Sequence, residues 1–179
     1  MAFKSNFQLP IVGVMGSGSV AHEARAQRLG RWLATRNVHL LTGGGGGVMR
    51  AVSRAFYEVS GRAGSVIGII PAADHNSGHP KTGYPNRWVE IPIATHLPLS
   101  GDLGENPLSR NNINVLSSKV IVALAGGQGT CAEVLLAQKY QRPLVAWLHH
   151  RDEIPDLPSS VVVESRFTAV RKFVEGYLA

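Results

Sequence analysis

Residues 119–140, KVIVALAGGQGTCAEVLLAQKY, hold the pattern that decides the fold of this chain. The segment opens with a continuous apolar run, Lys119 to Leu124, which is typical of a buried strand. A glycine-rich turn follows from Ala125 to Gly129, and we expect a helix from Thr130 to Tyr140. Because an apolar strand without alternation must be covered on both faces, the segment predicts a parallel sheet with helices on both sides.

The same alternation of strand and helix continues in both directions along the chain. Further strands are expected at Leu9–Met15, His39–Thr42, Ser65–Ile70, Trp88–Ile93 and Leu144–Leu148. Further helices are expected at Ala21–Arg36, at Val48–Ser60, from Ser109 to about Leu116 and from Phe167 to Tyr177. Residues 72–87 and 94–107 have no period and are predicted to be loops. The sequence therefore predicts one α/β domain over residues 1–179, a Rossmann-like doubly wound parallel sheet with helices on both faces.

The composition excludes several classes of protein. The chain has 179 residues, of which 44% are hydrophobic, so it is able to bury a core. It has one cysteine and therefore no internal disulfide, and it shows neither a signal segment nor an apolar run of membrane-spanning length. We therefore expect a cytoplasmic protein without membrane contact. The formal net charge is +6, but the basic residues form no block and aromatic residues are only 7%, so nucleic acid is not expected as a partner.

Three glycine-rich turns are expected to meet at one edge of the sheet. They are Gly16-Ser17-Gly18, Gly43 to Gly47 and Gly126 to Gly129, and each follows a predicted strand. The carboxyl ends of parallel strands lie along one edge, where the free N–H groups and dipoles of the following helices favour anions. One such turn has a purely structural explanation, whereas three turns on the same edge favour a ligand that the backbone approaches from several sides.

The sequence around the first turn narrows the choice of anion. Gly16 to Ala21 matches G-x-G-x-x-A, the dinucleotide pattern, but the second predicted strand ends at Thr42 without the acidic residue that would bind a ribose. The chain has no G-x-x-x-x-G-K-[ST], which excludes a nucleoside triphosphate loop of that kind. The sequence therefore predicts a phosphorylated small molecule that is held mainly by backbone amides.

Two charged side chains accompany these turns. Arg110 follows Ser109, a good helix N-cap, so its cation opposes the helix dipole at a cost of roughly 0.3–1 kcal/mol. That cost is explained if Arg110 faces an anion, and the alternative is an exposed arginine in water. Glu133 either closes a capping box with Thr130, or transfers a proton or holds a sugar hydroxyl in the site. The residue types alone do not separate these alternatives.

No metal site is predicted. His75 and His79 are four residues apart, but they lie in a segment rich in proline and glycine rather than on a helix. Cys131 is the single cysteine and has no identifiable histidine partner in the sequence, so we expect it to fill space in the core.

Several motifs resemble those of a known superfamily. The segment from Gly126 to Glu133, GGQGTCAE, resembles the PGGxGTxxE signature of the LOG (Lonely Guy) family, and the segment from Thr42 to Met49, TGGGGGVM, resembles its GGGxxGLM turn. The wider sequence is more similar to a sister branch, the molybdenum cofactor carrier proteins. That similarity is found at Ile11–Gly16, Leu41–Gly44, Gly47–Met49, Ile91–Ile93 and Arg110–Ser118. The resemblance covers about residues 10–148.

The two branches imply different activities. LOG enzymes hydrolyse the N-glycosidic bond of nucleoside 5′-monophosphates, and their catalytic glutamate and arginine match Glu133 and Arg110. The carriers bind and protect the molybdenum cofactor (Moco), a phosphorylated pterin dithiolene, without chemical turnover. Ala125 replaces the signature proline of the enzymes, the second turn is shorter, and the flanking sequence matches the carriers. The resemblance therefore favours a Moco carrier; the alternative is a LOG-like phosphoribohydrolase that cleaves AMP or cytokinin riboside monophosphates.

The resemblance also implies Moco as the bound cofactor and a homo-oligomer, either a dimer or a tetramer. The insertion from Asp74 to Arg87 is expected to cover the ligand or to serve assembly. The expected ligand-binding residues combine the three turns with the two charged side chains. They are Gly16, Ser17, Gly18, Gly43, Gly44, Gly45, Gly46, Gly47, Arg110, Gly126, Gly127, Gly129, Thr130 and Glu133.

Overall fold

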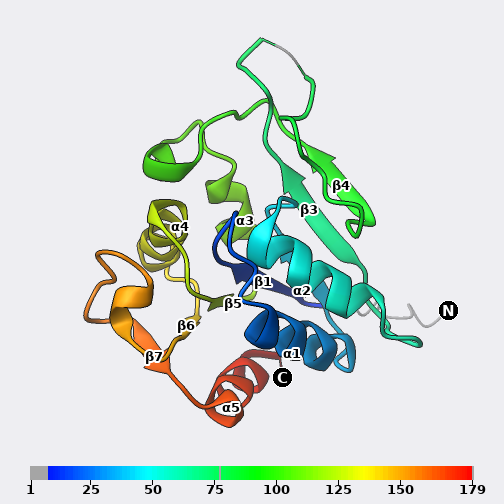
Figure 1. The fold of residues 1–179 in the computed structure, drawn as a ribbon, viewed down its shortest axis with the longest axis vertical. Coiled ribbons are helices and arrows are strands. Elements are labelled where there is room, and N and C mark those ends of the chain that lie inside the picture. The colour runs from blue at the N-terminus through cyan, green and yellow to red at the C-terminus, as the bar shows by residue number, and fades with distance from the viewer. Residues whose placement is uncertain (1–7, 77, 179) are drawn as a thin grey trace, which may run out of the picture.

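The computed structural model describes residues 8–76 and 78–178, and these form a parallel sheet of seven strands with helices around it (Figure 1). The strands are β1 (Ile11–Met15), β2 (His39–Thr42), β3 (Val66–Ile70), β4 (Ile91–Ala94), β5 (Val120–Ala123), β6 (Leu144–Trp147) and β7 (Val162–Glu164). Their order across the sheet is β4-β3-β2-β1-β5-β6-β7, and every neighbouring pair is parallel. The Rossmann-like α/β fold predicted from the sequence is therefore confirmed.

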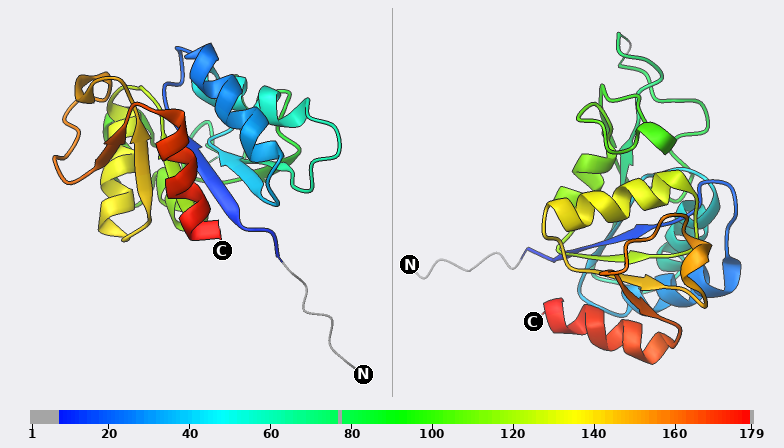
Figure 2. Two further views of the ribbon diagram at one scale, coloured as in Figure 1. Left: turned by 90° about the horizontal axis from the view of Figure 1, so that it is seen from below. Right: turned by 90° about the vertical axis from the view of Figure 1, so that its left-hand side faces the viewer.

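Helices cover both faces of the sheet (Figure 2). They are α1 (Glu23–Ala34), α2 (Gly47–Tyr57), α3 (Asn111–Ser117), α4 (Gln128–Lys139) and α5 (Phe167–Leu178). Buried side chains of α1, α2 and α5 share one hydrophobic cluster on one face, and those of α3 and α4 pack on the other face. None of the helices within the described residues is long and apolar enough to cross a membrane.

Strand β1 is the point at which the strand order reverses. From β1 the chain builds β2, β3 and β4 on one side, and it then returns to build β5, β6 and β7 on the other. Val14 and Met15 point to opposite faces of β1 and are both buried, so this strand is covered on both sides as its apolar sequence predicts. In open α/β sheets, ligands bind at such a switch point, beyond the carboxyl ends of the strands.

Helix α1 shows how a sequence pattern becomes packing. The predicted apolar stripe of Leu29, Trp32 and Leu33 is buried in the core, and each full burial of such a side chain stabilises the fold by about 1.5–3 kcal/mol. Gly30 lies on the same side of the helix, where a Cβ would come within 2.6 Å of the Val52 carbonyl oxygen. The glycine therefore lets α1 and α2 pack against each other at close range.

Two strands differ from the prediction. Strand β4 begins at Ile91 rather than Trp88, because Trp88 turns toward α2 and packs on Tyr57, with 5.4 Å between ring centroids. The side chain of Glu90 accepts a hydrogen bond from the N–H of Val66, at the start of β3, at 2.9 Å. Residues 88–90 therefore contact β3 without being part of strand β4. Strand β7 was not predicted, since its three residues are too few to show a period.

Candidate functional site

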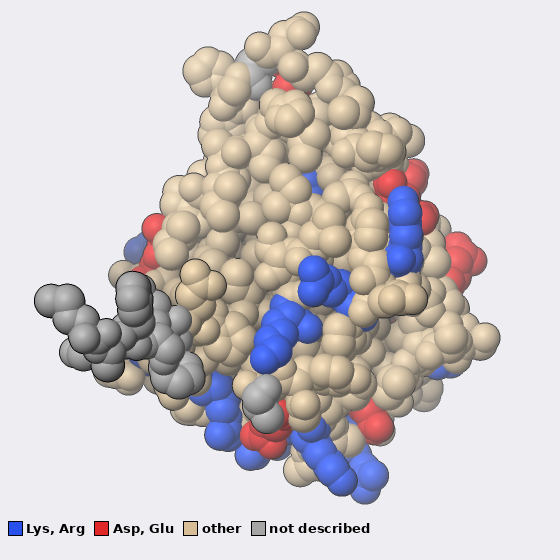
Figure 3. Space-filling model, turned by 180° about the vertical axis from the view of Figure 1, so that it is seen from behind, with Lys and Arg blue, Asp and Glu red and all other residues tan. Residues whose placement is uncertain are grey.

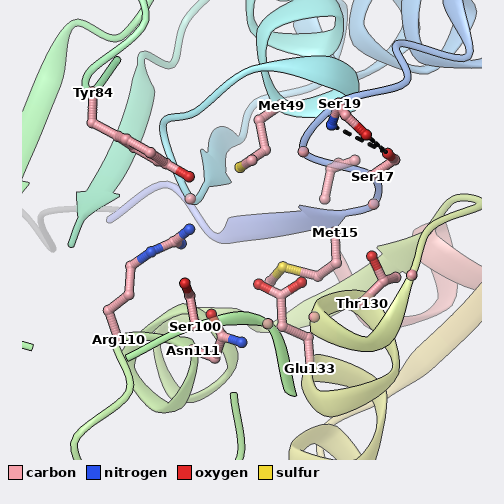
Figure 4. Close-up of a pocket in the computed structure, with 17 residues that line it drawn as sticks. Met15, Ser17, Ser19, Met49, Tyr84, Ser100, Arg110, Asn111, Thr130 and Glu133 are labelled. Carbon is pink, nitrogen blue, oxygen red and sulfur yellow. Dashed lines mark hydrogen bonds between the residues drawn. The ribbon is translucent and has the colours of Figure 1, made fainter. Parts of the chain in front are cut away.

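A cavity of about 380 Å³ opens at the carboxyl edge of the sheet, beyond the ends of β1, β2 and β5 (Figure 4). The three glycine turns that were predicted to meet at one edge all contribute to its wall. The residues of the turns that line it are Gly16, Ser17, Gly18, Gly43, Gly127 and Gly129, and Thr130 lines it from the first turn of α4. The side chains of Arg110 and Glu133 complete the wall, so turns from three strands and two charged groups surround one space.

Ser17 ties the three turns together. Its N–H donates to the carbonyl of Ala125 at 3.0 Å, and its carbonyl accepts the N–H of Val48, at the start of α2, at 2.9 Å. Its Oγ accepts the N–H of Val20 at 2.9 Å and closes the first turn. The backbone of Ser17 is therefore occupied by protein partners, and the residue holds the rim of the cavity in shape.

The second turn lies largely outside the cavity, and only Gly43 of its residues lines the wall. Gly44 and Gly47 have positive φ angles of 74° and 53°. A Cβ at Gly47 would overlap the carbonyl oxygen of Ser17, and a Cβ at Gly46 would lie 2.8 Å from that of Gly18. These glycines therefore allow the first and second turns to pack backbone against backbone.

Arg110 is buried at the start of α3, with 5% of its surface exposed. Its Nε and Nη1 are shielded from solvent and donate to no residue that the structure describes. The guanidinium lies against Gly43, where a Cβ would overlap it, and it points into the cavity (Figure 4). The alternative of an exposed arginine is therefore wrong, and the cation carries an uncompensated desolvation cost.

Tyr84 forms the wall behind Arg110. Its ring centroid is 5.7 Å from Arg110 Cζ, and its ring packs so closely on Gly45 that a Cβ there would lie 2.7 Å from it. The loop that carries Tyr84 is anchored by Asn86, which donates its backbone N–H to Gly44 O at 2.7 Å and its Nδ2 to Gly45 O at 2.9 Å. The insertion after β3 therefore supplies an aromatic wall to the cavity.

Glu133 lies inside α4, with 8% of its surface exposed, and its carboxyl points into the cavity (Figure 4). Asn114 Nδ2 donates to its Oε1 at 2.9 Å. Burial raises the pKa of the Glu133 carboxyl, while the Arg110 charge and the Asn114 hydrogen bond lower it in part. Because α4 begins at Gln128, Glu133 is too far along the helix to cap it, and the capping-box alternative is wrong.

The third turn brings the N-terminus of α4 to the cavity. The N–H of Gly126 donates to the carbonyl of Glu153, on the side away from the cavity. The N–H groups of Gly127, Gln128 and Gly129 donate to none of the residues from 8 to 76 and 78 to 178. Gly127 and Gly129 line the cavity wall, so a helix of 12 residues presents its free amides and the positive end of its dipole there.

The comparison with known families decides the classification. The model of the SLOG cluster4 family matches residues 9–170. The chain belongs to this family. A relative of this SLOG cluster4 protein, an uncharacterized protein of Archaeoglobus fulgidus, is 32% identical over 130 residues, which cover 72% of this chain and 73% of the relative.

Solved structures confirm the resemblance of this SLOG cluster4 protein to the Moco carrier branch. The Moco carrier protein of Chlamydomonas reinhardtii is 32% identical with a TM-score of 0.69, and the match covers 94% of this chain and 99% of that one. The molybdenum cofactor binding protein of Rippkaea orientalis is 30% identical with a TM-score of 0.70. This match covers 97% of this chain and 99% of that one.

The SLOG cluster4 chain places the predicted site residues in two groups. Nine line the cavity: Gly16, Ser17, Gly18, Gly43, Arg110, Gly127, Gly129, Thr130 and Glu133. Five do not line it. Gly46, Gly47 and Gly126 pack against the first turn, whereas Gly44 lies against Ile70 and Gly45 against the Tyr84 ring. Further residues of the site were not predicted from the sequence: Met15, Met49, Tyr84, Ser100 and Asn111 in the wall, and Asn114 behind Glu133. Met15, Met49, Asn111 and Asn114 lie within the segments that resemble the Moco carriers, but no residue pattern marks them as site residues, and only their neighbours in space give them that place.

Cys131 lies one turn into α4 and is buried against the core rather than in the cavity wall. Burial raises the pKa of its thiol, which makes the sulfur a poor nucleophile in agreement with the prediction of a core residue. Within the described part of this SLOG cluster4 chain, no three His, Cys, Asp or Glu side chains gather as a metal site would require.

Proposed function

We propose that this protein binds Moco in the cavity at the carboxyl edge of the sheet and acts as a carrier that protects it. The observation that carries the proposal is Arg110, a buried guanidinium with two unpartnered N–H donors beside an open space. Such a group requires an anion to offset its desolvation. Two relatives of about 30% identity, one named a Moco carrier and one a molybdenum cofactor binding protein, indicate which anion this is.

The donors around the cavity fit a phosphorylated pterin. Free amides at the start of α4 suit a phosphate monoester, and Ser100 and Asn111 offer polar side chains to the ring system. The volume of about 380 Å³ lies within the roughly 300–1,000 Å³ that is usual for small-molecule sites. In this function Moco is cargo, so the residues of the chain hold and shield it and take no part in bond breaking.

The test is the survival of Moco in the presence of the purified chain. Moco released from a molybdoenzyme is incubated with the protein under air, and the intact fraction is measured by reconstitution of a Moco-free apoenzyme. We expect a several-fold longer half-life with the wild-type chain and no protection by Arg110→Met. Arg31→Met is the matched control, because Arg31 is exposed and donates a hydrogen bond to Gln27 on its own helix, away from the cavity. Equal lability with and without protein contradicts the proposal.

The second candidate function is hydrolysis of the N-glycosidic bond of a nucleoside 5′-monophosphate. It is favoured by Glu133, a buried carboxyl whose pKa is raised by burial and which faces the same cavity as Arg110. Such a group is suited to proton transfer or to stabilising a ribosyl cation. Incubation with AMP and detection of ribose 5-phosphate test it. Product that disappears in Glu133→Gln supports the enzyme, and unchanged AMP after long incubation excludes it.

We further propose that the chain assembles with a second copy of itself through the β4 edge of the sheet. Ile91 and Ile93 are 42% and 43% exposed, on the face of the sheet opposite to α1 and α2. Seen from behind, the upper part of the surface carries few charged side chains, whereas Lys and Arg lie across its middle and lower part (Figure 3). Exposed apolar edge strands are covered in stable proteins. Analytical ultracentrifugation of the wild-type chain and of Ile93→Lys tests this, and a wild-type monomer contradicts it.

A further inference from the structure

The cavity has two positively charged regions, one beyond the end of β5 and one beyond the end of β2. At the end of β5, α4 presents the amides of Gly127, Gln128 and Gly129, which have no partner among the described residues. The dipole of a helix of this length is equivalent to about half a positive charge at its N-terminus. At the end of β2, the guanidinium of Arg110 lies against Gly43 and adds a full positive charge.

The two positively charged regions are separated by the width of the sheet between β2 and β5. The strand order places β1 between β2 and β5, so the ends of β2 and β5 are two strand spacings apart. At roughly 4.8 Å for each spacing, the ends of β2 and β5 are about 10 Å apart, which sets the scale of the separation between Arg110 beside Gly43 and the amides of α4. Arg110 and Thr130 accordingly lie on opposite sides of the Glu133 carboxyl in Figure 4.

Among the residues that the structure describes, none forms an ion pair or a hydrogen bond with the guanidinium of Arg110 or with the free amides of α4. Arg110 forms no ion pair with any described residue, and its Nε and Nη1 have no acceptor. Glu133 forms no ion pair with Arg110, and its Oε1 accepts a hydrogen bond from Asn114. A ligand with a single anionic group would compensate one end and leave the other uncompensated.

We infer that the cavity takes a molecule with two anionic groups about 10 Å apart, one held by Arg110 and the other by the free amides of α4. The inference concerns the same site as the proposed function and rests on it for the identity of the natural ligand. In Moco the two groups are the phosphate and the molybdenum-bearing dithiolene. A nucleoside monophosphate has only one, so the two-ended cavity also favours the carrier over the hydrolase.

The experiment uses alkyl phosphates as probes and needs no knowledge of the ligand. Binding of hexanediol bisphosphate, whose extended phosphates span about the distance between the two ends, is compared by calorimetry with binding of hexyl phosphate. We expect the bisphosphate to bind at least about tenfold more tightly, since its second group binds at a high effective concentration. Ethanediol bisphosphate is too short to span the cavity and is expected to show no more than a roughly twofold statistical gain over ethyl phosphate.

Two variants assign the ends. Arg110→Met is expected to lower the affinity for hexanediol bisphosphate to that for hexyl phosphate. Gly129→Asp, which sets a carboxylate at the α4 end, is expected to do the same, whereas the neutral Gly129→Asn is expected to keep most of the gain. The Cβ of residue 129 would meet only ordinary contacts with Gly101 at 3.5 Å, so both substitutions fit the fold.

The outcomes separate this inference from the proposed function. Equal affinity of the wild-type chain for hexyl phosphate and hexanediol bisphosphate, or no binding of either, overturns the inference, whether or not Moco is protected. A tenfold gain together with no protection of Moco keeps the two-ended cavity and rejects Moco as its occupant. Because the wild-type comparison carries the test, a variant that fails to fold does not remove it.

Discussion

The second and third glycine turns look alike in the sequence and have different roles in the fold. Gly43 to Gly47 packs against the first turn and the Tyr84 loop, and only Gly43 reaches the cavity. Gly126 to Gly129 runs into α4 and leaves free amides at the cavity wall. Glycine permits a close approach to the backbone. The comparison shows that the approaching group is the chain itself at one turn and, in the proposed function, a ligand at the other.

The largest effect is expected at the second turn. Gly47→Ala combines a positive φ of 53° with a Cβ that overlaps the Ser17 carbonyl oxygen, and we expect it to lower the free energy of unfolding by about 2–4 kcal/mol. Gly61→Ala is the matched control, since φ is 75° there but nothing lies within 4 Å of the Cβ; its cost is expected to be about 1–2 kcal/mol. Urea unfolding measures both. Equal losses contradict the role assigned to the Ser17 contact.

Arg110, which lies between the second turn and the cavity, has an opposite expected effect on stability. Arg110→Met removes an unpartnered buried charge, and without ligand we expect it to raise the free energy of unfolding by about 1–2 kcal/mol while anion binding is lost. Urea unfolding without ligand and calorimetry with the alkyl phosphates measure the two effects on one variant. A loss of stability would mean that the guanidinium has protein partners that compensate its burial.

A smaller effect distinguishes the two carboxyls on either side of the third turn. Burial raises the pKa of Glu133 on the cavity side, so the folded chain binds its proton more strongly than the unfolded chain, whose pKa is about 4.3. The stabilising contribution of Glu133 is therefore fully present at pH values below the pKa of the unfolded chain. It falls as the pH rises through the pKa of the folded chain. Unfolding free energies of wild type and Glu133→Gln between pH 4 and 8 are expected to diverge, in favour of the variant at the higher pH.

Glu153, behind the turn, provides the contrast. Its hydrogen bond and ion pair with Arg25, 2.6 Å long, lower the pKa of its carboxyl. Its contribution to stability is therefore present at pH values above the pKa of the unfolded chain, and it is lost as the pH falls through the pKa of the folded chain. Glu153→Gln is therefore expected to lose stability relative to wild type at neutral pH and to approach it in acid. The same sign of pH dependence for both variants would contradict the assignment of the two environments.

The smallest effect is expected at the third turn itself. Gly127→Ala has an ordinary φ of −91° and no atom within 4 Å of its Cβ, so we expect its free energy of unfolding to stay within about 0.5 kcal/mol of wild type. Urea unfolding measures it beside Gly47→Ala. A loss as large as that of Gly47→Ala would mean that both turns serve packing alone, and the contrast between them would be lost.

The sequence predicted the elements of the site better than its contacts. The apolar run before Gly126 predicted β5 and the start of a helix, because an unbroken apolar run and a glycine turn are local properties. Arg110 was predicted to face an anion from its place at a helix start, and the structure places it in the cavity wall. The insertion from Asp74 to Arg87 was predicted to cover the ligand or to serve assembly, but Tyr84 was not singled out within it, since an aromatic residue in a glycine- and proline-rich segment has no distinctive pattern.

The sequence by itself determined the alternation of strands and helices, the parallel sheet and the edge at which three turns would meet. These features follow from hydrophobic periodicity and from the residue types of turns, and both are properties of a few consecutive residues. Only the tertiary structure decided which glycines open to the cavity, that Gly43 makes room for Arg110, and that Asn114 bonds Glu133. Each of these depends on groups brought together from distant segments, and spacing along a chain carries no measure of distance across a fold.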